Sequence, residues 1–286
     1  AAFRSFEQRL QNLSEGELLV ALPFMEKLSL SARDHYQGFI LKFTEQLNSR
    51  EHRDELLKGL RSKQIRTRRM CTHVLLNSAR PDISLALDRL KSEPDPFLRQ
   101  LLFTKLRSLH LDMNECIDIL LSDKHHANRA LALQYLYDAN SENTFEIAKK
   151  LLLDSSTTVR KLAQKIVPEY RPEFDLLRFY YENFSQNPSA SILGIGETGS
   201  ALDADRIAMY LRDDRTEVIC AAIISLAKLN KEKYKGEIVN QLANSRMRPV
   251  KTARRIILLY EIADYKRIKE IFDQTALEYN KIKCLS

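Results

Sequence analysis

Glycine and proline are scarce in this sequence, and tryptophan is absent. The chain of 286 residues has 7 glycines and 8 prolines, whereas hydrophobic residues make up 44% of it. Few helix-breaking residues in a chain with ample apolar side chains favour helices joined by short turns. Runs in which β-branched and aromatic residues alternate with polar ones are missing, so we expect almost no β-sheet.

Cysteine pairs and long apolar runs are missing as well. The four cysteines stand far apart, at Cys71, Cys116, Cys220 and Cys284. They form no CxxC pair and no zinc-type spacing with histidine, so we expect free thiols in a reducing, cytoplasmic compartment. No run of about 18 apolar residues predicts a transmembrane helix. The N-terminus has neither a signal-peptide core nor an initiator methionine, which leaves open that the chain is the soluble part of a longer, membrane-anchored protein.

One helix–turn–helix pattern recurs along the chain. From Leu151 to Val167, an apolar helix end leads into Asp154, a polar turn and a second helix with apolar residues at helical spacing. Because such a hairpin exposes an apolar face that it cannot bury alone, the pattern predicts stacked hairpins. Positions equivalent to Arg160 recur about every 30 residues. They are Arg33, Arg68, Arg99, Arg129, Arg160, Ser191, Ile219 and Lys251.

These features resemble the HEAT repeat family, in particular its short, phycobilisome-lyase-like repeats. The family motif D-x4-V-[RK] is matched by Asp154, Val159 and Arg160, and in part by Asp123 with Arg129 and by Asp213 with Val218. The resemblance implies an all-α, right-handed α-solenoid of about seven to eight hairpins. It predicts one solenoid domain over 1–286, with N-terminal cap helices in 1–22, repeats in 23–263 and a C-terminal cap helix in 264–286.

The resemblance also gives the aspartates and arginines of the turns a structural role. In HEAT repeats these residues form a ladder of hydrogen bonds along the stack, so we expect Arg99, Arg129 and Arg160 to be structural. The aspartates Asp123, Asp154 and Asp213 are further predicted to cap the second helices. Periodicity predicts helix pairs at 51–60 and 64–79, 82–91 and 94–109, 112–122 and 125–138, 142–153 and 156–168, 171–184 and 188–197, 201–211 and 214–229, and 232–243 and 246–263, with a last helix at 265–279.

Residues 168–200 are the irregular part of the pattern. A G-x-G-x-x-G sequence is present at Gly194, Gly196 and Gly199. Dinucleotide binding would require a strand before it and a helix after it in a βαβ unit. The preceding residues 180–184 are helical in pattern, so we favour a helix-stopping turn with a local change of curvature.

Motifs for catalysis and metal binding are not found. The sequence contains no G-x-S-x-G, H-E-x-x-H or phosphate-binding loop. His125 and His126 lie in a predicted turn without Cys, Asp or Glu at ligand spacing, which argues against a metal site. We therefore expect no cofactor, no metal and no enzyme activity.

Two basic clusters, at the predicted starts of two second helices, suggest a binding role. The leading hypothesis is a non-enzymatic scaffold or adaptor that binds another protein, with an acidic surface, on the concave solenoid face. Nucleic acid and anionic lipid remain alternatives, including an alkylation-repair-type DNA glycosylase, although such HEAT-like enzymes use tryptophans that this chain lacks. The candidate partner-binding residues are Arg66, Arg69, Lys161, Lys165, Arg248, Lys251, Arg254 and Arg255.

Overall fold

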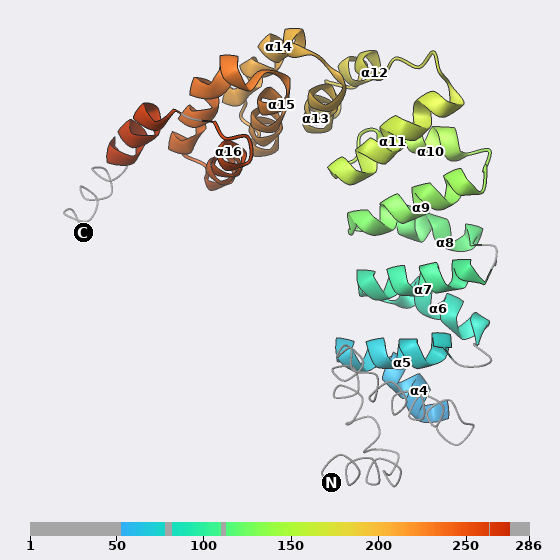
Figure 1. Ribbon diagram of the computed structural model, residues 1–286. Helices are drawn as coiled ribbons and strands as arrows, with labels where there is room; N and C mark the ends of the chain where they lie inside the picture. The colour runs from blue at the N-terminus through green and yellow to red at the C-terminus, as the bar shows by residue number, and fades with distance from the viewer. Residues whose placement is uncertain (1–52, 78–81, 110–112, 263, 275–286) are drawn as a thin grey trace. The chain divides into compact units, whose positions relative to one another are not determined.

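Figure 1 shows the computed structural model, which describes residues 53–77, 82–109, 113–262 and 264–274. Throughout these residues the regular elements are α- and 3-10 helices, so the all-α prediction is confirmed for them. The chain divides into two compact units, Ala1–Ala132 and Leu133–Ser286. In each unit, helices that follow one another in the chain pack together. The predicted N-terminal cap helices and the repeat position at Arg33 lie outside the described residues.

The first unit consists of stacked helix pairs. Its described helices are α4 (Arg53–Leu60), α5 (Ile65–Asn77), α6 (Ile83–Ser92), α7 (Pro96–Ser108), α8 (Asn114–Leu121) and the start of α9 (His126–Asp138). Helix α4 packs on α5 and α6 packs on α7, while α5 also packs on α7 and α6 on α8. Equivalent helices of successive pairs therefore lie side by side, as α5 and α7 do in Figure 1.

Apolar side chains from every pair fill the interior of this stack. Each contributes about 1.5–3 kcal/mol when fully removed from water. Fully buried examples, one or two from each helix from α4 to α8, are Leu56, Leu60, Val74, Leu90, Phe103 and Leu120. The stack is stable because the apolar stripe of each hairpin is covered by its neighbours.

The second unit contains helices of more varied length, from short 3-10 turns to the long helix α15. They are α10 (Thr144–Leu151), α11 (Thr157–Tyr170), α12 (Leu176–Glu182), α13 (Pro188–Thr198), η2 (Ala201–Asp203), α14 (Ala204–Ala208), η3 (Met209–Arg212), α15 (Thr216–Asn240), η4 (Gln241–Ala243) and α16 (Met247–Leu259). Helix α15 is central to this unit, because α13, α14 and α16 all pack on it. Residues 265–274 are also helical, within the predicted last helix.

Helix α15 is kinked where the sequence predicts a break between two helices. Asn230 has φ −159° and ψ 76°, which are not helical values. Its side-chain oxygen accepts a hydrogen bond from the Lys233 N–H at 3.1 Å, as the first residue of a new helix commonly does. The predicted helices 214–229 and 232–243 therefore correspond to the two halves of α15.

The prediction is less accurate around residues 168–212. Helix α11 continues through Pro168 to Tyr170 instead of ending at the proline. Pro168 has no N–H to donate to the carbonyl four residues earlier, so the helix lacks one hydrogen bond there. The next helix, α12, begins at Leu176 and not at 171. The predicted helix 201–211 is a short α-helix between two 3-10 turns.

One hydrogen bond recurs at the turn before most second helices. A side-chain oxygen accepts the backbone N–H of the residue two positions later, at 2.7 to 3.1 Å. The accepting residues are Ser62, Glu93, Asp123, Asp154, Asp213 and Asn244. Neighbouring members are about 30 residues apart, with one gap of twice that length after Asp154. In that gap, before α13, the Asn187 N–H bonds to the Asn183 carbonyl oxygen instead.

This recurring bond corrects two sequence predictions. Each acceptor holds the N–H of the residue just before the helix, so Asp123, Asp154 and Asp213 fix the turn and do not cap the first helical turn. The bond also fixes the repeat register. Arg160 is six residues after Asp154, and the sixth residue after Asn244 is Val250. Val250 is therefore the equivalent of Arg160, and the predicted equivalent, Lys251, is one residue too far toward the C-terminus.

Candidate binding surface

The arginines of the repeat positions are held inside the turns. In Arg68, Arg99, Arg129 and Arg160 the Nη1 atom donates to the backbone carbonyl oxygen six residues earlier. Arg68 Nε also donates to Glu93 Oε1 at 3.0 Å, and Arg99 Nε to Asp123 Oδ2 at 2.7 Å. The bonds of Arg68 and Arg99 to carboxylates join successive pairs, as the predicted ladder requires, and the bonds of Arg129 lie within its own turn.

Arg160 departs from this pattern because its acidic partner is Glu197, at the end of α13. Arg160 Nε lies 3.0 Å from Glu197 Oε2 and Nη2 lies 2.6 Å from Oε1, which makes a bidentate ion pair. Gln164 Nε2 donates to the same carboxylate at 3.0 Å and to the Tyr180 hydroxyl at 2.9 Å. Lys228 of α15 approaches Glu197 at 3.3 Å. We refer to these five residues as the junction cluster.

The ion pair at the centre of the junction cluster is buried, and Lys228 adds a second positive charge at its partly exposed edge. The side chains of Arg160 and Glu197 are 0% and 2% exposed. Burial alone would raise the pKa of Glu197, but the hydrogen bond and charge of Arg160, with Lys228 and Gln164, lower it below its ordinary value. Burial raises the pKa of Tyr180 to about 12. At neutral pH Glu197 is therefore ionised and Tyr180 neutral, and the cluster ties α11 and α12 to α13 and α15.

The three glycines of the G-x-G-x-x-G sequence belong to α13 and its end. Gly194 and Gly196 are helical and Gly199 is the C-cap, so no strand precedes the sequence and the dinucleotide alternative is wrong. A Cβ atom on Gly194 would collide with the Tyr180 ring, and one on Gly196 would lie 2.8 Å from the Ser225 Cα. Glycine therefore allows α13 to approach α12 and α15 closely.

The exposed face of α16 carries four of the eight predicted binding residues. This helix buries Pro249, Ala253 and Ile256. Its opposite side, which we refer to as the α16 face, consists of Met247, Arg248, Lys251, Arg254, Arg255, Leu258 and Leu259, all exposed. In the described part of the chain, its four cationic side chains make no hydrogen bond or ion pair, and α16 contains no acidic residue.

Apolar side chains lie at both ends of the same face. Met247 is 66% exposed at the start of the helix, and Leu258 and Leu259 are 70% and 68% exposed at its end. The face therefore offers positive charge in the middle and apolar contact at each end. Sequence reasoning identified the cations but not these apolar residues, which helical spacing places beside them.

The other predicted binding residues have different surroundings. Lys161 and Lys165 are exposed on α11, one helical turn apart. Arg69 is half-buried and already engaged in an interaction within the chain. Arg66 is in α5, but its side chain is outside the described residues. Of the eight predicted residues, Arg248, Lys251, Arg254 and Arg255 are thus the largest group that one helix brings together.

Among the described residues no group of three or more His, Cys, Asp or Glu side chains is placed to hold a metal ion. His125 stacks on His126, with ring centroids 5.0 Å apart, and contacts the tilted Phe97 ring at 5.1 Å. Cys71, Cys116 and Cys220 are buried and form no disulfide, and burial raises the pKa of Cys71 to about 12. Cys284 lies outside the described residues.

Comparison with known proteins gives no further guidance. No protein-family model matches the sequence, and no curated protein is detectably similar to it. None of the helices in the described ranges has the length and apolar character needed to cross a membrane.

Proposed function

We propose that this protein is a non-enzymatic scaffold of the HEAT type, a right-handed α-solenoid, whose α16 face binds an acidic protein partner. The observation that carries the proposal is the set of four exposed cations on one helix, none of them paired within the described chain. Stacked hairpins and the turn ladder support the HEAT-type architecture. Such a repeat array offers an extended surface to a partner, which supports a role in binding.

The charges of α16 weaken the helix when it is unbound. Lys251 and Arg255 are one turn apart, and like charges at this spacing destabilise a helix by about 0.2–0.5 kcal/mol. Arg246 and Arg248 lie at its N-terminus, where the helix dipole disfavours positive charge. An anionic partner relieves both effects on binding, so the same residues that cost stability favour association.

The apolar ends of the α16 face favour a protein over a nucleic acid. A phosphate backbone offers no apolar surface for Met247, Leu258 and Leu259, whereas an amphipathic acidic helix offers both carboxylates and apolar side chains. Protein interfaces commonly combine an apolar part with a charged rim. We therefore rank an acidic protein surface above DNA or RNA.

The proposal is tested by measuring binding of three labelled probes at several salt concentrations. The probes are an acidic amphipathic peptide, duplex DNA and vesicles with anionic lipid. We expect the peptide to bind, and Arg254→Glu with Arg255→Glu to weaken its binding at least tenfold at an unchanged melting temperature. The control Lys235→Glu with Lys269→Glu makes the same charge change at exposed residues elsewhere and leaves the affinity unchanged. Preference for DNA or vesicles contradicts the proposal.

A further inference from the structure

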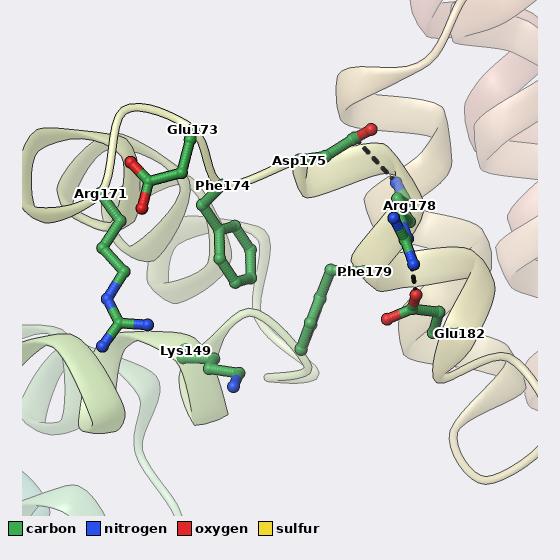
Figure 2. A pocket seen from close by; sticks show the side chains of 8 residues that line it. All are labelled: Lys149, Arg171, Glu173, Phe174, Asp175, Arg178, Phe179 and Glu182. Atoms are coloured by element: carbon green, nitrogen blue, oxygen red, sulfur yellow. Dashed lines mark hydrogen bonds and ion pairs between the residues drawn. The ribbon is translucent and has the colours of Figure 1, made fainter.

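A pocket lies at a different place in the second unit, between α10 and α12. Its volume is about 370 Å³. Lys149 comes from α10, four residues come from the segment between α11 and α12, and three come from α12 (Figure 2). The lining residues are Lys149, Arg171, Glu173, Phe174, Asp175, Arg178, Phe179 and Glu182.

Two phenyl rings form the apolar part of the pocket. Phe174 and Phe179 are half-buried, with ring centroids 5.6 Å apart. Phe174 also contacts the buried Phe145 ring at 6.0 Å, and Phe179 contacts the buried Tyr180 ring at 5.7 Å. The two rings are thus fixed from behind by the core, and each leaves part of its surface open to the pocket.

Some charged groups of the pocket have hydrogen-bond or ion-pair partners and others have none among the described residues. Arg178 Nε pairs with Glu182 at 2.7 Å, and Asp175 accepts the Arg178 N–H at 2.9 Å. Lys149 has no hydrogen bond or ion pair to any described residue. The Arg171 guanidinium lies over the Phe145 ring at 4.2 Å, without a carboxylate partner in the described chain.

Both unpaired cations line the same pocket as the two open rings. Figure 2 shows the Lys149 side chain beside Phe174 and Phe179, with Arg171 and Glu173 on one side and the Arg178–Glu182 pair on the other. Glu173 is the one lining carboxylate without a hydrogen bond or ion pair to the described residues. The lining as a whole holds three cations and three carboxylates, but Lys149 and Arg171 are two cations without a carboxylate partner in the described chain.

We propose that this pocket binds an acidic peptide segment of a protein in which an aromatic or leucine side chain is adjacent to Asp or Glu. The apolar side chain enters between Phe174 and Phe179, and the carboxylate pairs with Lys149 and Arg171. Five of the eight lining residues are exposed, so a small molecule would remain largely in water, whereas a peptide gains contacts along its length. The inference concerns α10 and α12 and does not depend on the α16 face.

The test compares two adjacent lysines on α10. A random peptide library is selected on the protein, and affinities of the enriched peptides are measured by fluorescence anisotropy. We expect enrichment of an aromatic residue or leucine next to Asp or Glu, and at least tenfold weaker binding to Lys149→Glu. Lys150→Glu, which introduces the same charge change at an exposed residue outside the pocket, keeps the affinity.

Other outcomes overturn the proposal. Enriched peptides without an acidic residue, or equal losses in Lys149→Glu and Lys150→Glu, would mean that the pocket does not recognise this chemistry. Phenylpropanoate that binds as tightly as the peptides would make the pocket a small-molecule site. Arg254→Glu with Arg255→Glu is expected to leave peptide binding unchanged, so failure here is distinguishable from failure of the α16 proposal.

Discussion

At the scale of single residues, the Glu197 carboxylate is held by several partners at once. It is buried, it accepts from Arg160 and Gln164, and Lys228 adds a second positive charge. An unpaired buried charge is far more costly than a paired one, so the two members of the ion pair depend on each other. The cluster is therefore sensitive to the loss of either member.

Replacement of Glu197 by Ala is expected to lower the free energy of unfolding by about 3–5 kcal/mol, because it leaves the Arg160 charge buried without its partner. Urea denaturation of the variant and the parent measures the difference. Glu182→Ala removes the exposed ion pair with Arg178 and serves as the control, with little expected change. Equal losses in the two variants would contradict the role of the junction cluster.

The lowered pKa of Glu197 predicts that the stability of the protein depends on pH. The pKa of Glu197 is lowered in the folded protein, so its contribution to stability is fully present above its ordinary value of 4.5 and is lost as the pH falls through the lowered value. Comparison with Glu197→Gln isolates this contribution from those of other acids. We expect the stability difference between parent and variant to stay constant above pH 4.5 and to narrow below it. A stability difference that widens below pH 4.5 would mean that folding raises the pKa of Glu197 instead of lowering it.

At the scale of elements, close helix contacts explain where glycine occurs. Gly196 faces Ser225 of α15, where the Ser225 hydroxyl donates to the Ile192 carbonyl oxygen at 2.8 Å. Gly236, in the second half of α15, has open space where its Cβ would be. The two glycines thus share a helical conformation but differ in packing.

Gly196→Ala and Gly236→Ala are expected to change stability in opposite directions. The first forces α13 away from α15 and costs about 1–3 kcal/mol, as extra atoms in a packed interface commonly do. The second replaces glycine in a helix without a clash and stabilises by about 0.5–1 kcal/mol. Thermal melting followed by circular dichroism measures both. A Gly196→Ala variant that melts like the parent would show that the α13–α15 contact relaxes freely.

At the scale of the whole molecule, the chain consists of two compact units with buried thiols in each. Cys71 and Cys116 report on the first unit and Cys220 on the second. The high pKa of Cys71 keeps its sulfur as the unreactive thiol until unfolding exposes it. These cysteines therefore allow each unit to be followed separately.

In a helical repeat array each hairpin contacts its neighbours, so effects of a substitution are local. We expect Gly196→Ala to lower the urea concentration at which Cys220 becomes reactive, and to leave that of Cys71 and Cys116 unchanged. Thiol labelling in a Cys284→Ser background, followed by mass spectrometry, gives the three midpoints. Midpoints that shift together would show that the chain unfolds as one cooperative unit.

The amino-acid sequence was informative wherever structure depends on near neighbours in the chain. Apolar spacing predicted most helices within a few residues, and the turn residues Asp123 and Asp154 marked the hairpins. Arg68 and Arg99 bond to the next turn, 25 and 24 residues away, which a regular repeat makes predictable. The cations of α16 were likewise visible in the sequence, because a helix places residues three and four apart on one face.

By itself, the sequence determined that this protein is helical, built from recurring hairpins and basic along α16. Only the tertiary structure decided that Arg160 pairs with Glu197, 37 residues away, that Gly194 and Gly196 serve close packing, and that Lys149 adjoins two open rings. For the Arg160–Glu197 pair, the one signal in the sequence was that Glu197 is the only charged residue of α13. The sequence could not predict these contacts because periodicity and turn bonds act between near neighbours in the chain. The contacts depend instead on how the irregular hairpin around α12 and α13 packs.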